Sequence, residues 1–414
     1  MGLPAAQPRR TLRFMLQTSS TQTPKPPELI PDTFKIRRDL AAPEQGPRAL
    51  FFCGGSALDG LSRQITAYTH NSIHLITPFD SGGSSAVLRH AFDMPGIGDL
   101  RHRLLALADQ SAPHSSDVCQ LLQYRLSAEG TKEALYQELG DIVTGGHQLI
   151  SGLPPAVRQQ ITEQLDCLWQ QLPGSFDLRQ ASIGNLVLAG GYLALGNNLG
   201  ASLQRLSDLL NIRGTVRGIV NESLHLGVNL ADGHTFIGQH LLTGKEHPDI
   251  RSPVRSIFLS GSAGEHRPIT VQVNQETSQL IAGADIICYA PGSFYSSLMA
   301  NLLPGGVAEA VAEASCPKVF IPNIGVDPEQ LGMDFTATIE TLITQLRRGR
   351  ASAAVSDLLN YVLIDVDRSH YTYEIDSELL KALGIELLEL PLITKLSAPF
   401  YDDDRLAQVL LSLA

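Results

Sequence analysis

Short apolar runs alternate with helical patterns in this chain, and two of the runs end in glycine-rich loops one βαβ unit apart. The run 48–53 ends at Gly54, a helical pattern fills 57–69, and the run 72–77 leads to a second loop at Gly82. Gly54 and Gly82 lie 28 residues apart, which is the length of one βαβ unit. Since right-handed crossovers make such strands parallel, we expect both loops at the carboxyl edge of one sheet.

The same alternation returns after residue 284. Strand patterns cover 284–289, 318–322, 361–366 and 385–390, and helical patterns cover 293–303, 308–314, 335–347, 377–383 and 403–413. Strands that alternate with helices predict an α/β fold built on a doubly wound, mainly parallel sheet.

The middle of the chain has a different pattern. Helical patterns dominate 111–180, 184–195 and 199–210, and 214–220 is a strand pattern. Two short strand patterns then flank Asp232-Gly233, a pair that favours a type I′ turn, so residues 224–239 predict a β-hairpin. We expect this hairpin to be an insert or an antiparallel edge of the sheet.

Three regions are expected along the chain. Residues 1–46 start with a tail rich in Pro, Thr and Ser and are expected to form a largely disordered N-terminal extension. Residues 47–330 are expected to form the ligand-binding domain, and residues 331–414 are expected to continue it as a C-terminal α/β extension. A chain of 414 residues is long enough to bury a large core.

The composition argues against several classes of protein. A net charge of −11 disfavours general nucleic-acid binding. No apolar run reaches the roughly 18 residues that a membrane helix needs. The five cysteines are scattered and form no CxxC pair, so neither a zinc site nor a disulfide framework is expected. Reduced, buried cysteines fit a cytoplasmic protein.

Four loops that contain glycine follow strand patterns, and all four would lie at the carboxyl edge of the sheet, where open α/β sheets bind ligands. Their candidate binding residues are Gly54, Gly55 and Ser56; Gly82, Gly83, Ser84 and Ser85; Gly292 and Ser293; and Asn323. Glycine lets the backbone approach a ligand, and free N–H groups at a helix start attract phosphate. One such loop can be a plain turn, but four at one edge predict a pocket for an anion. Neither a Walker A pattern nor a good GxGxxG fingerprint occurs.

Charged residues near the second loop are candidates for binding phosphate and metal. Asp80 opens this loop, and Asp99 stands where an N-cap would, before an apolar helix. Either carboxylate could bind Mg²⁺, since hard cations prefer oxygen ligands, or could simply cap a turn or helix. Arg89 and Arg101 are the expected phosphate counter-charges, because a guanidinium matches phosphate oxygens bidentately; the alternative for both is a surface ion pair.

Two further polar side chains have both a binding and a structural interpretation. Asn185 opens an apolar helix and needs a hydrogen-bond partner if it is buried, which a ligand or the backbone could supply. Tyr295 could stack on a base or bond a sugar hydroxyl, or it could pack in the core. Ser293 and Ser296 have no general base nearby in the sequence, so no serine nucleophile is predicted.

Taken together, these motifs resemble the CofD-like superfamily, which includes 2-phospho-L-lactate transferases and YvcK-type gluconeogenesis factors. The matching blocks are Cys53–Leu58, Thr77–Arg89, Gly98–Asp109, Ser182–Leu188, Gly214–Glu222 with the Asp232-Gly233 hairpin, and Ala284–Leu303 followed by Lys318–Gly325. They span about residues 48–330, and the tail after residue 330 departs from the pattern. The resemblance implies a Rossmann-like three-layer αβα fold and a ligand of the nucleoside-diphosphate type.

The resemblance implies two functions for one pocket. The segments 80–85, 98–101 and 291–295 are closer to the YvcK-type branch, which implies a regulatory protein that binds a nucleotide or nucleotide sugar, such as a UDP-sugar, in carbon or cell-envelope metabolism. The alternative is a Mg²⁺-dependent transferase, with Asp80 and Asp99 as the catalytic and metal-binding residues, that releases a nucleoside monophosphate. A homodimer is compatible with the sequence, which does not specify the oligomeric state.

Overall fold

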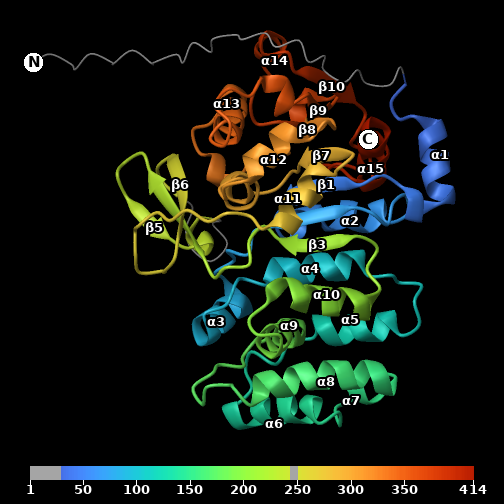
Figure 1. Ribbon diagram of the computed structural model, residues 1–414, viewed down its shortest axis with the longest axis vertical. Coiled ribbons are helices and arrows are strands. Elements are labelled where there is room, and N and C mark those ends of the chain that lie inside the picture. Colours follow the sequence, from blue (N-terminus) through green and yellow to red (C-terminus); the bar gives the residue numbers. More distant parts are fainter. Residues whose placement is uncertain (1–28, 243–249) are drawn as a thin grey trace, which may run out of the picture.

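The computed structural model describes residues 29–242 and 250–414. Its centre is a seven-stranded sheet in which every pair of neighbouring strands is parallel (Figure 1). The strands are β1 (Ala49–Cys53), β2 (Ile73–Ile76), β3 (Thr215–Gly218), β7 (Ile286–Tyr289), β8 (Lys318–Phe320), β9 (Tyr361–Asp365) and β10 (Glu386–Leu390). The predicted α/β fold with a doubly wound parallel sheet is confirmed.

The order of the strands locates the switch point of the sheet, where the direction of building reverses. The order is β10-β9-β8-β7-β1-β2-β3, so the chain builds outward from β1 to β3 on one side and later adds β7 to β10 on the other. The direction of building therefore reverses between β1 and β7. In open α/β sheets, ligands bind outside the carboxyl ends of the strands at such a switch point. The C-terminal strands β9 and β10 belong to this same sheet.

Strand β1 shows why the sheet is buried on both sides. All five of its residues are buried. Phe51 and Cys53 pack in one hydrophobic cluster, and Leu50 and Phe52 pack in the other. Because successive side chains of a strand point to opposite faces, a strand covered on both faces is apolar at every position. The apolar run that predicted this strand follows directly from its central place.

Helices cover the two faces of the sheet (Figure 1). The cluster that contains Phe51 also holds side chains of α2 (Asp59–Ile65), α4 (Gly98–Leu107), α15 (Asp403–Leu413) and α1 (Thr33–Ala41). The cluster that contains Phe52 holds side chains of α11 (Gln275–Ala282), α12 (Val307–Glu313), α13 (Phe335–Leu346) and α14 (Ser377–Leu383). The result is the expected three-layer αβα arrangement.

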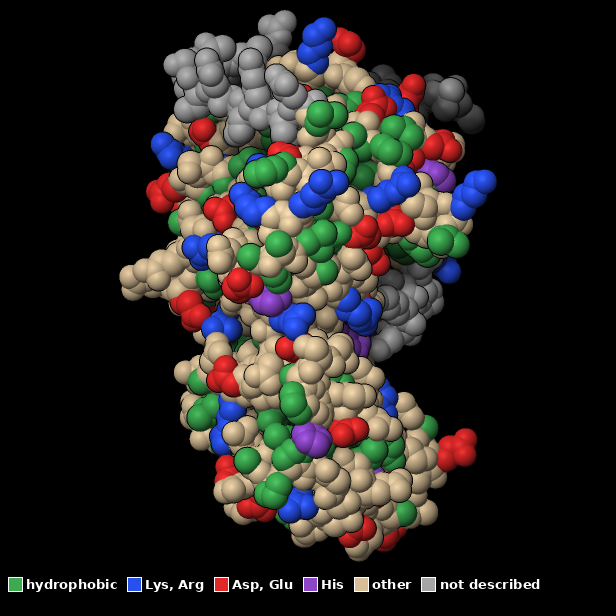
Figure 2. Space-filling view, turned by 90° about the vertical axis from the view of Figure 1, so that its right-hand side faces the viewer, with side chains coloured by type: hydrophobic (Ala, Val, Ile, Leu, Met, Phe, Trp, Pro, Cys, Tyr) green, Lys and Arg blue, Asp and Glu red, His purple; other side chains and the backbone are tan. Residues whose placement is uncertain are grey.

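A helical lobe extends below β3 and α4 in Figure 1, and it forms the narrower lower part of Figure 2. It consists of α5 (Ser115–Gln123), α6 (Lys132–Val143), α7 (Gln148–Ser151), α8 (Pro155–Trp169), α9 (Ile183–Ala194) and α10 (Leu199–Leu210). Helices α8 and α9 approach very closely, because a Cβ atom at Gly190 would lie only 1.9 Å from the carbonyl oxygen of Gln164. Only glycine fits at that crossing.

The predicted hairpin belongs to a second, separate sheet. This sheet has three antiparallel strands in the order β5-β4-β6: β4 (His225–Leu230), β5 (Thr235–Ile237) and β6 (Val254–Ser260). The hairpin prediction is confirmed, but the type I′ turn is wrong. Only Gly233 has a positive φ, +93°, whereas a type I′ turn needs two such residues. Four residues, 231–234, connect the strands.

The folded region begins before residue 47. Asp32 caps α1, and its backbone N–H donates to Ser412 Oγ in the C-terminal helix α15 at 2.8 Å. The expectation that folding starts near residue 47 is therefore wrong for residues 32–46, because the C-terminal helix gives α1 a surface on which to pack. Residues 1–28 of the predicted extension lie outside the described residues.

In the described part of the chain, no helix has the length and apolarity required to cross a bilayer.

The packing of α1 leads to a prediction about stability. Ile36 is 7% exposed and belongs to the cluster under the sheet, whereas Phe34 on the same helix is 79% exposed. We expect Ile36→Ala to lower the free energy of unfolding by about 2 kcal/mol in urea denaturation, because it leaves a cavity in the core. Phe34→Ala is the control and should leave it unchanged. Equal effects of the two substitutions would show that α1 does not pack as described.

Candidate functional site

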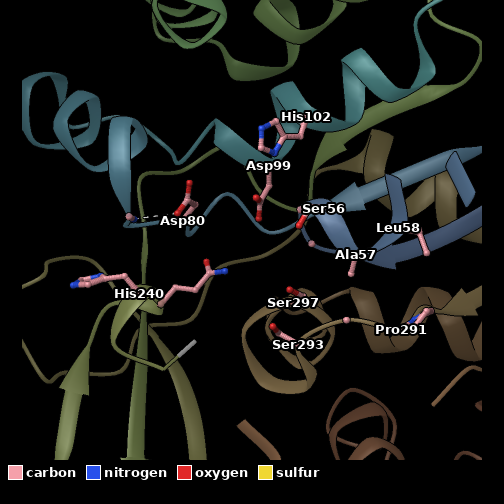
Figure 3. Close-up of a pocket in the computed structure, with 15 residues that line it drawn as sticks. Ser56, Ala57, Leu58, Asp80, Asp99, His102, His240, Pro291, Ser293 and Ser297 are labelled. Atoms are coloured by element: carbon pink, nitrogen blue, oxygen red, sulfur yellow. Dashed lines mark hydrogen bonds between the residues drawn. The ribbon is translucent and has the colours of Figure 1, made fainter. Parts of the chain in front are cut away.

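A cavity of about 210 Å³ lies at the switch point, between the loops that follow β1, β2 and β7 (Figure 3). It is lined by Gly54, Gly55, Ser56, Ala57, Leu58, Asp80, Gly82, Asp99, His102, Gln239, His240, Pro291, Gly292, Ser293 and Ser297. Three of the four predicted glycine-bearing loops therefore meet in one place. The loop after β8 does not line the cavity.

The loop after β1 is packed between two other elements of the site. A Cβ atom at Gly54 would lie 2.2 Å from Ser297 Oγ, and one at Gly55 would lie 2.2 Å from Asp99 Oδ1. Both glycines are thus required for close approach rather than for an unusual backbone angle. The short helix that starts at Ser56 has no side-chain cap at its N-terminus. Its residues Ser56, Ala57 and Leu58 line the cavity, and the lack of a capping side chain at a helix start is a feature of anion sites.

Arg103 supports this loop from inside the protein. Its side chain is fully buried, and its guanidinium donates to the carbonyl oxygens of Gly54 at 3.2 Å and of Gly55 at 2.7 Å. The same group lies 3.5 Å from a carboxylate oxygen of Asp59. Sequence analysis missed Arg103, although it lies four residues after Asp99 in α4 and therefore on the same helical face.

Asp80 and Asp99 both line the cavity, on segments above it in Figure 3. Asp80 Oδ1 accepts a hydrogen bond from the backbone N–H of Gly82 at 3.1 Å, so this carboxylate also caps its own turn. Asp99 is not the N-cap of α4, as its sequence position had predicted. That position belongs to Ile97, and Asp99 is the second residue of the helix, with its carboxylate against Gly55.

The predicted phosphate counter-charges, Arg89 and Arg101, do not line this cavity. Arg101 lies two residues after Asp99, so the helix turns it away from the cavity. It is 3% exposed and donates to the carbonyl oxygen of Leu122 at 3.1 Å, against α5. Its neighbour in sequence, His102, is three residues after Asp99 and does line the cavity. Burial lowers the pKa of Arg101 to about 10.

Arg89 lies outside the main cavity as well. Its guanidinium donates to the carbonyl oxygens of Phe79, Asp80 and Leu224 at 2.6 to 3.1 Å. It therefore joins the loop after β2 to the start of the three-stranded sheet. Arg89 lines a second cavity of about 380 Å³ that borders the first one at His240. Burial lowers its pKa to about 10.

Three other candidates from the second loop and α9 have structural roles. Ser84 Oγ accepts hydrogen bonds from the backbone N–H of Ser182 and the side-chain amide of Asn185, both at 3.3 Å. Ser85 Oγ accepts one from the backbone N–H of Ile97 at 3.1 Å. These bonds fix α3 (Gly83–Phe92) against α9 and α4. Gly83, Ser84, Ser85 and Asn185 do not line the cavity, so their contact with a ligand stays a prediction.

The loop after β7 is held by two buried carboxylates. It leads into η4 (Phe294–Met299), a π-helix within the predicted helical segment. Glu329 accepts hydrogen bonds from the backbone N–H groups of Tyr295 and Ser296 at 2.8 and 2.7 Å, and Asp327 accepts one from Phe294 at 2.8 Å. The first N–H groups of this helix are therefore occupied by protein carboxylates and cannot bind a phosphate.

Tyr295 and Asn323 lie behind this loop and do not line the cavity. The Asn323 side chain accepts a hydrogen bond from Gly292 N at 2.6 Å and donates to the Gly292 carbonyl oxygen at 2.5 Å. The Tyr295 hydroxyl donates to the sulfur of Met333 at 3.3 Å. Asn323 thus fixes the loop whose residues Gly292 and Ser293 face the cavity.

The cavity contains residues that sequence analysis missed. They are Ala57, Leu58, His102, Gln239, His240, Pro291 and Ser297. Most lie within three residues of a predicted one, and helical spacing from Asp99 could have indicated His102. Gln239 and His240 could not be found this way, because they lie in the short 3-10 helix Gln239–Leu241 that follows β5 of the three-stranded sheet. His240 Nδ1 lies 2.8 Å from Ser81 Oγ, which joins that sheet to the loop after β2.

The cavity fits Mg²⁺ only together with a ligand. Among residues 29–242 and 250–414, no group of three or more His, Cys, Asp or Glu side chains is arranged to hold a metal ion. Two carboxylates, Asp80 and Asp99, line the cavity. Mg²⁺ is commonly held by one or two carboxylates, with substrate phosphates and water supplying the other ligands. The donor set is therefore of the kind that binds a metal–phosphate complex.

The buried Glu329 predicts a pH dependence of stability. Burial, and then the nearby Asp327, raise its pKa from 4.5 to about 7. A carboxyl group with a raised pKa in the folded state binds its proton more tightly when folded, so its contribution to stability is present below about pH 4.5 and is lost as the pH rises toward 7. We expect urea denaturation to show that the free energy of unfolding of the wild type falls between about pH 4.5 and 7, and falls less in Glu329→Gln. Glu313→Gln, at an exposed position, is the control and should show the same fall as the wild type. A fall in Glu329→Gln as large as that of the wild type would contradict the assignment.

Comparison with known proteins identifies relatives of this chain. A protein-family model described as "2-phospho-L-lactate transferase CofD" matches residues 50–393. The match includes the segment after residue 330, so the expectation that this tail departs from the family pattern is wrong. The gluconeogenesis factor of Bacillus subtilis (strain 168) is 26% identical over 378 residues, which cover 89% of this chain and 98% of that protein.

Two further comparisons concern a second relative and the fold. The gluconeogenesis factor of Halalkalibacterium halodurans is 26% identical over 343 residues, covering 81% of this chain and 86% of that protein. A crystal structure of a UPF0052 family protein from Bacillus halodurans has the same fold, with a TM-score of 0.64, 22% identity, and coverage of 89% of this chain and 99% of that one. Because the family match covers most of the sheet and the complete cavity, the chain belongs to the CofD family.

Proposed function

We propose that this protein binds a nucleoside-diphosphate-linked ligand, either a UDP-sugar or a nucleotidyl-activated phosphoacid, at the carboxyl edge of its sheet. In this proposal it acts as a regulatory binding protein of carbon or cell-envelope metabolism. The names of the relatives, gluconeogenesis factors, support a role in carbon metabolism. The observation that carries the proposal is the cavity at the switch point, formed by three glycine-bearing loops and two carboxylates.

The charges of the cavity indicate how a diphosphate would bind. Asp80 and Asp99 carry negative charge, and no lysine or arginine is among the described residues that line the cavity. A diphosphate placed beside two carboxylates would be repelled unless a cation lay between them. A Mg²⁺ ion held by Asp80, Asp99 and the phosphate oxygens would supply that charge. The N–H groups after Gly55 would bind the remaining phosphate oxygens.

A second function, a Mg²⁺-dependent transferase, is favoured by the same two carboxylates and by the description of the family. Bound Mg²⁺ would stabilise the negative charge that develops when a phosphoryl bond breaks. In this chain Asp80 and Asp99 would orient the diphosphate, and the loops after β1 and β7 would limit the access of water. An acceptor alcohol would then displace a nucleoside monophosphate from the donor.

Metal dependence tests the binding proposal. We expect calorimetric titration to detect binding of UDP-N-acetylglucosamine or GDP-mannose with millimolar Mg²⁺ and its loss in excess EDTA. Asp99→Asn should weaken binding about 10- to 100-fold, since it removes a charged ligand of the metal. Asp166→Asn on the exposed face of α8 is the matched control and should bind as the wild type does. Absence of binding to nucleotides with and without Mg²⁺ would disprove the proposal.

Turnover separates the two functions. If the protein is a regulatory binding protein, incubation with the bound nucleotide-linked ligand, Mg²⁺ and an alcohol acceptor should release no nucleoside monophosphate, as measured by chromatography. Release that disappears in Asp80→Asn, while the Asp166→Asn control retains it, would establish the transferase instead.

A further inference from the structure

The side chain of Gln239 is buried at the wall of the main cavity without a hydrogen-bond partner. It is 8% exposed, and its Oε1 atom has no partner in the described part of the chain. A buried amide oxygen that accepts no hydrogen bond is unfavourable, because it has lost its bonds to water without gaining one from the protein. Such a group in a binding cavity is best explained by a bond made when a ligand is present.

Other buried glutamines show what an ordinary structural role looks like. Gln345 is 6% exposed, and its Nε2 donates to the carbonyl oxygen of Leu302 at 2.7 Å. Gln164 is 1% exposed, and its Nε2 donates to the carbonyl oxygen of Gln160 at 3.0 Å. The Gln345 bond joins two separate segments of the chain, whereas the Gln164 bond lies within α8 and leaves its Oε1 without a partner. Gln239 makes neither kind of bond, and unlike these two glutamines it lines the main cavity.

The backbone that carries Gln239 is firmly held. Gly238 N donates to the carbonyl oxygen of Leu226 at 2.8 Å, and His240 N donates to Ser81 Oγ at 3.3 Å. Leu242, just after this turn, is completely buried. The amide is therefore presented by a fixed turn between two anchors, which is the preorganisation that selective recognition requires. Figure 3 shows His240 across the cavity from Asp99.

The position of Gln239 indicates which part of a ligand it would meet. The proposed phosphate-binding elements, the Gly54–Gly55 loop with Asp80 and Asp99, follow strands of the main sheet. Gln239 begins a short 3-10 helix, Gln239–Leu241, that follows β5 of the three-stranded sheet, on another wall. The second cavity begins beyond it, at Gly238 and His240. A group attached to the phosphate that lies farther from the Gly54–Gly55 loop would thus extend past Gln239 into the second cavity. A neutral amide pairs with hydroxyl groups, which every sugar carries, and with the acetamido group of an N-acetyl sugar.

We propose that Gln239 is a specificity-determining residue that hydrogen-bonds an uncharged sugar group of the nucleotide-linked ligand, so that the three-stranded sheet selects the group attached to the diphosphate. This inference rests on the proposed binding function. It assigns recognition of the group attached to the diphosphate to a residue outside the glycine-bearing loops.

The test compares ligands with and without the sugar. Calorimetry with Mg²⁺ would measure the affinity of wild type and Gln239→Met for UDP and UDP-N-acetylglucosamine, and for GDP and GDP-mannose. We expect Gln239→Met to weaken the sugar nucleotide about 5- to 30-fold and to leave the free diphosphate unchanged. Equal effects on both ligands, or no effect on either, would overturn the inference while the binding function stands. Failure of the wild type to bind any of these probes would overturn both.

A second readout needs no ligand. Replacing an unpaired buried amide by an apolar side chain of similar shape should stabilise the ligand-free protein, so Gln239→Met should raise the melting temperature by about 1–3 °C. The matched control Gln345→Met loses a hydrogen bond and should lower it, with no effect on nucleotide affinity. A lower melting temperature for Gln239→Met would show that Gln239 is structural and would overturn the inference. Gln239→Glu, which keeps the size of the side chain, should also lose the preference for the sugar nucleotide.

Discussion

The site depends on one helix, α4, holding one loop. Arg103 binds the carbonyl oxygens of Gly54 and Gly55 from within the protein, and Asp99 touches Gly55 from the side of the cavity. The two side chains are four residues apart and share a face of the helix, so a single rigid element both supports the loop and places a carboxylate beside it. The full burial of the Arg103 guanidinium makes this support costly to remove, because its partners would lose bonds to a charged donor. The other walls of the cavity, which include Gln239, His240 and the segment from Pro291 to Ser297, surround this loop.

The fold and the location of the site could be predicted because they follow from local patterns. Continuous apolar runs such as β1 reflect burial on both faces, and parallel connections place the loops after β1, β2 and β7 at one edge. The direction of individual side chains could not be predicted in the same way. Arg101 was expected to face a phosphate in the same site as Asp99, but residues two apart on a helix point in different directions. Gln239 entered the site through tertiary packing, which no local pattern reveals.

Carboxylates from elsewhere in the chain determine whether the N–H groups that follow a glycine-bearing loop are already hydrogen-bonded. The loop after β7 has the sequence of an anion site, yet Asp327 and Glu329 already occupy the N–H groups that follow it. The loop after β1 has no such capping side chain. Two loops that look alike in sequence thus differ in function: one can accept an anion, and the other forms a wall. The negative charge that a ligand must overcome comes from Asp80 and Asp99, while the positive charges of Arg89 and Arg101 are used to hold main-chain carbonyl groups.

The reversal of strand order between β1 and β7 also has a consequence for biosynthesis. The loops after β1 and β2 and the start of α4 are complete by residue 99, but the wall formed by Pro291 to Ser297 is made much later, and its buried support, Glu329, later still. A growing chain on the ribosome therefore exposes both cavity carboxylates long before it can enclose a ligand. The cavity forms only when the second half of the sheet docks against β1. A ligand can therefore bind only after nearly the whole chain has been made and folded.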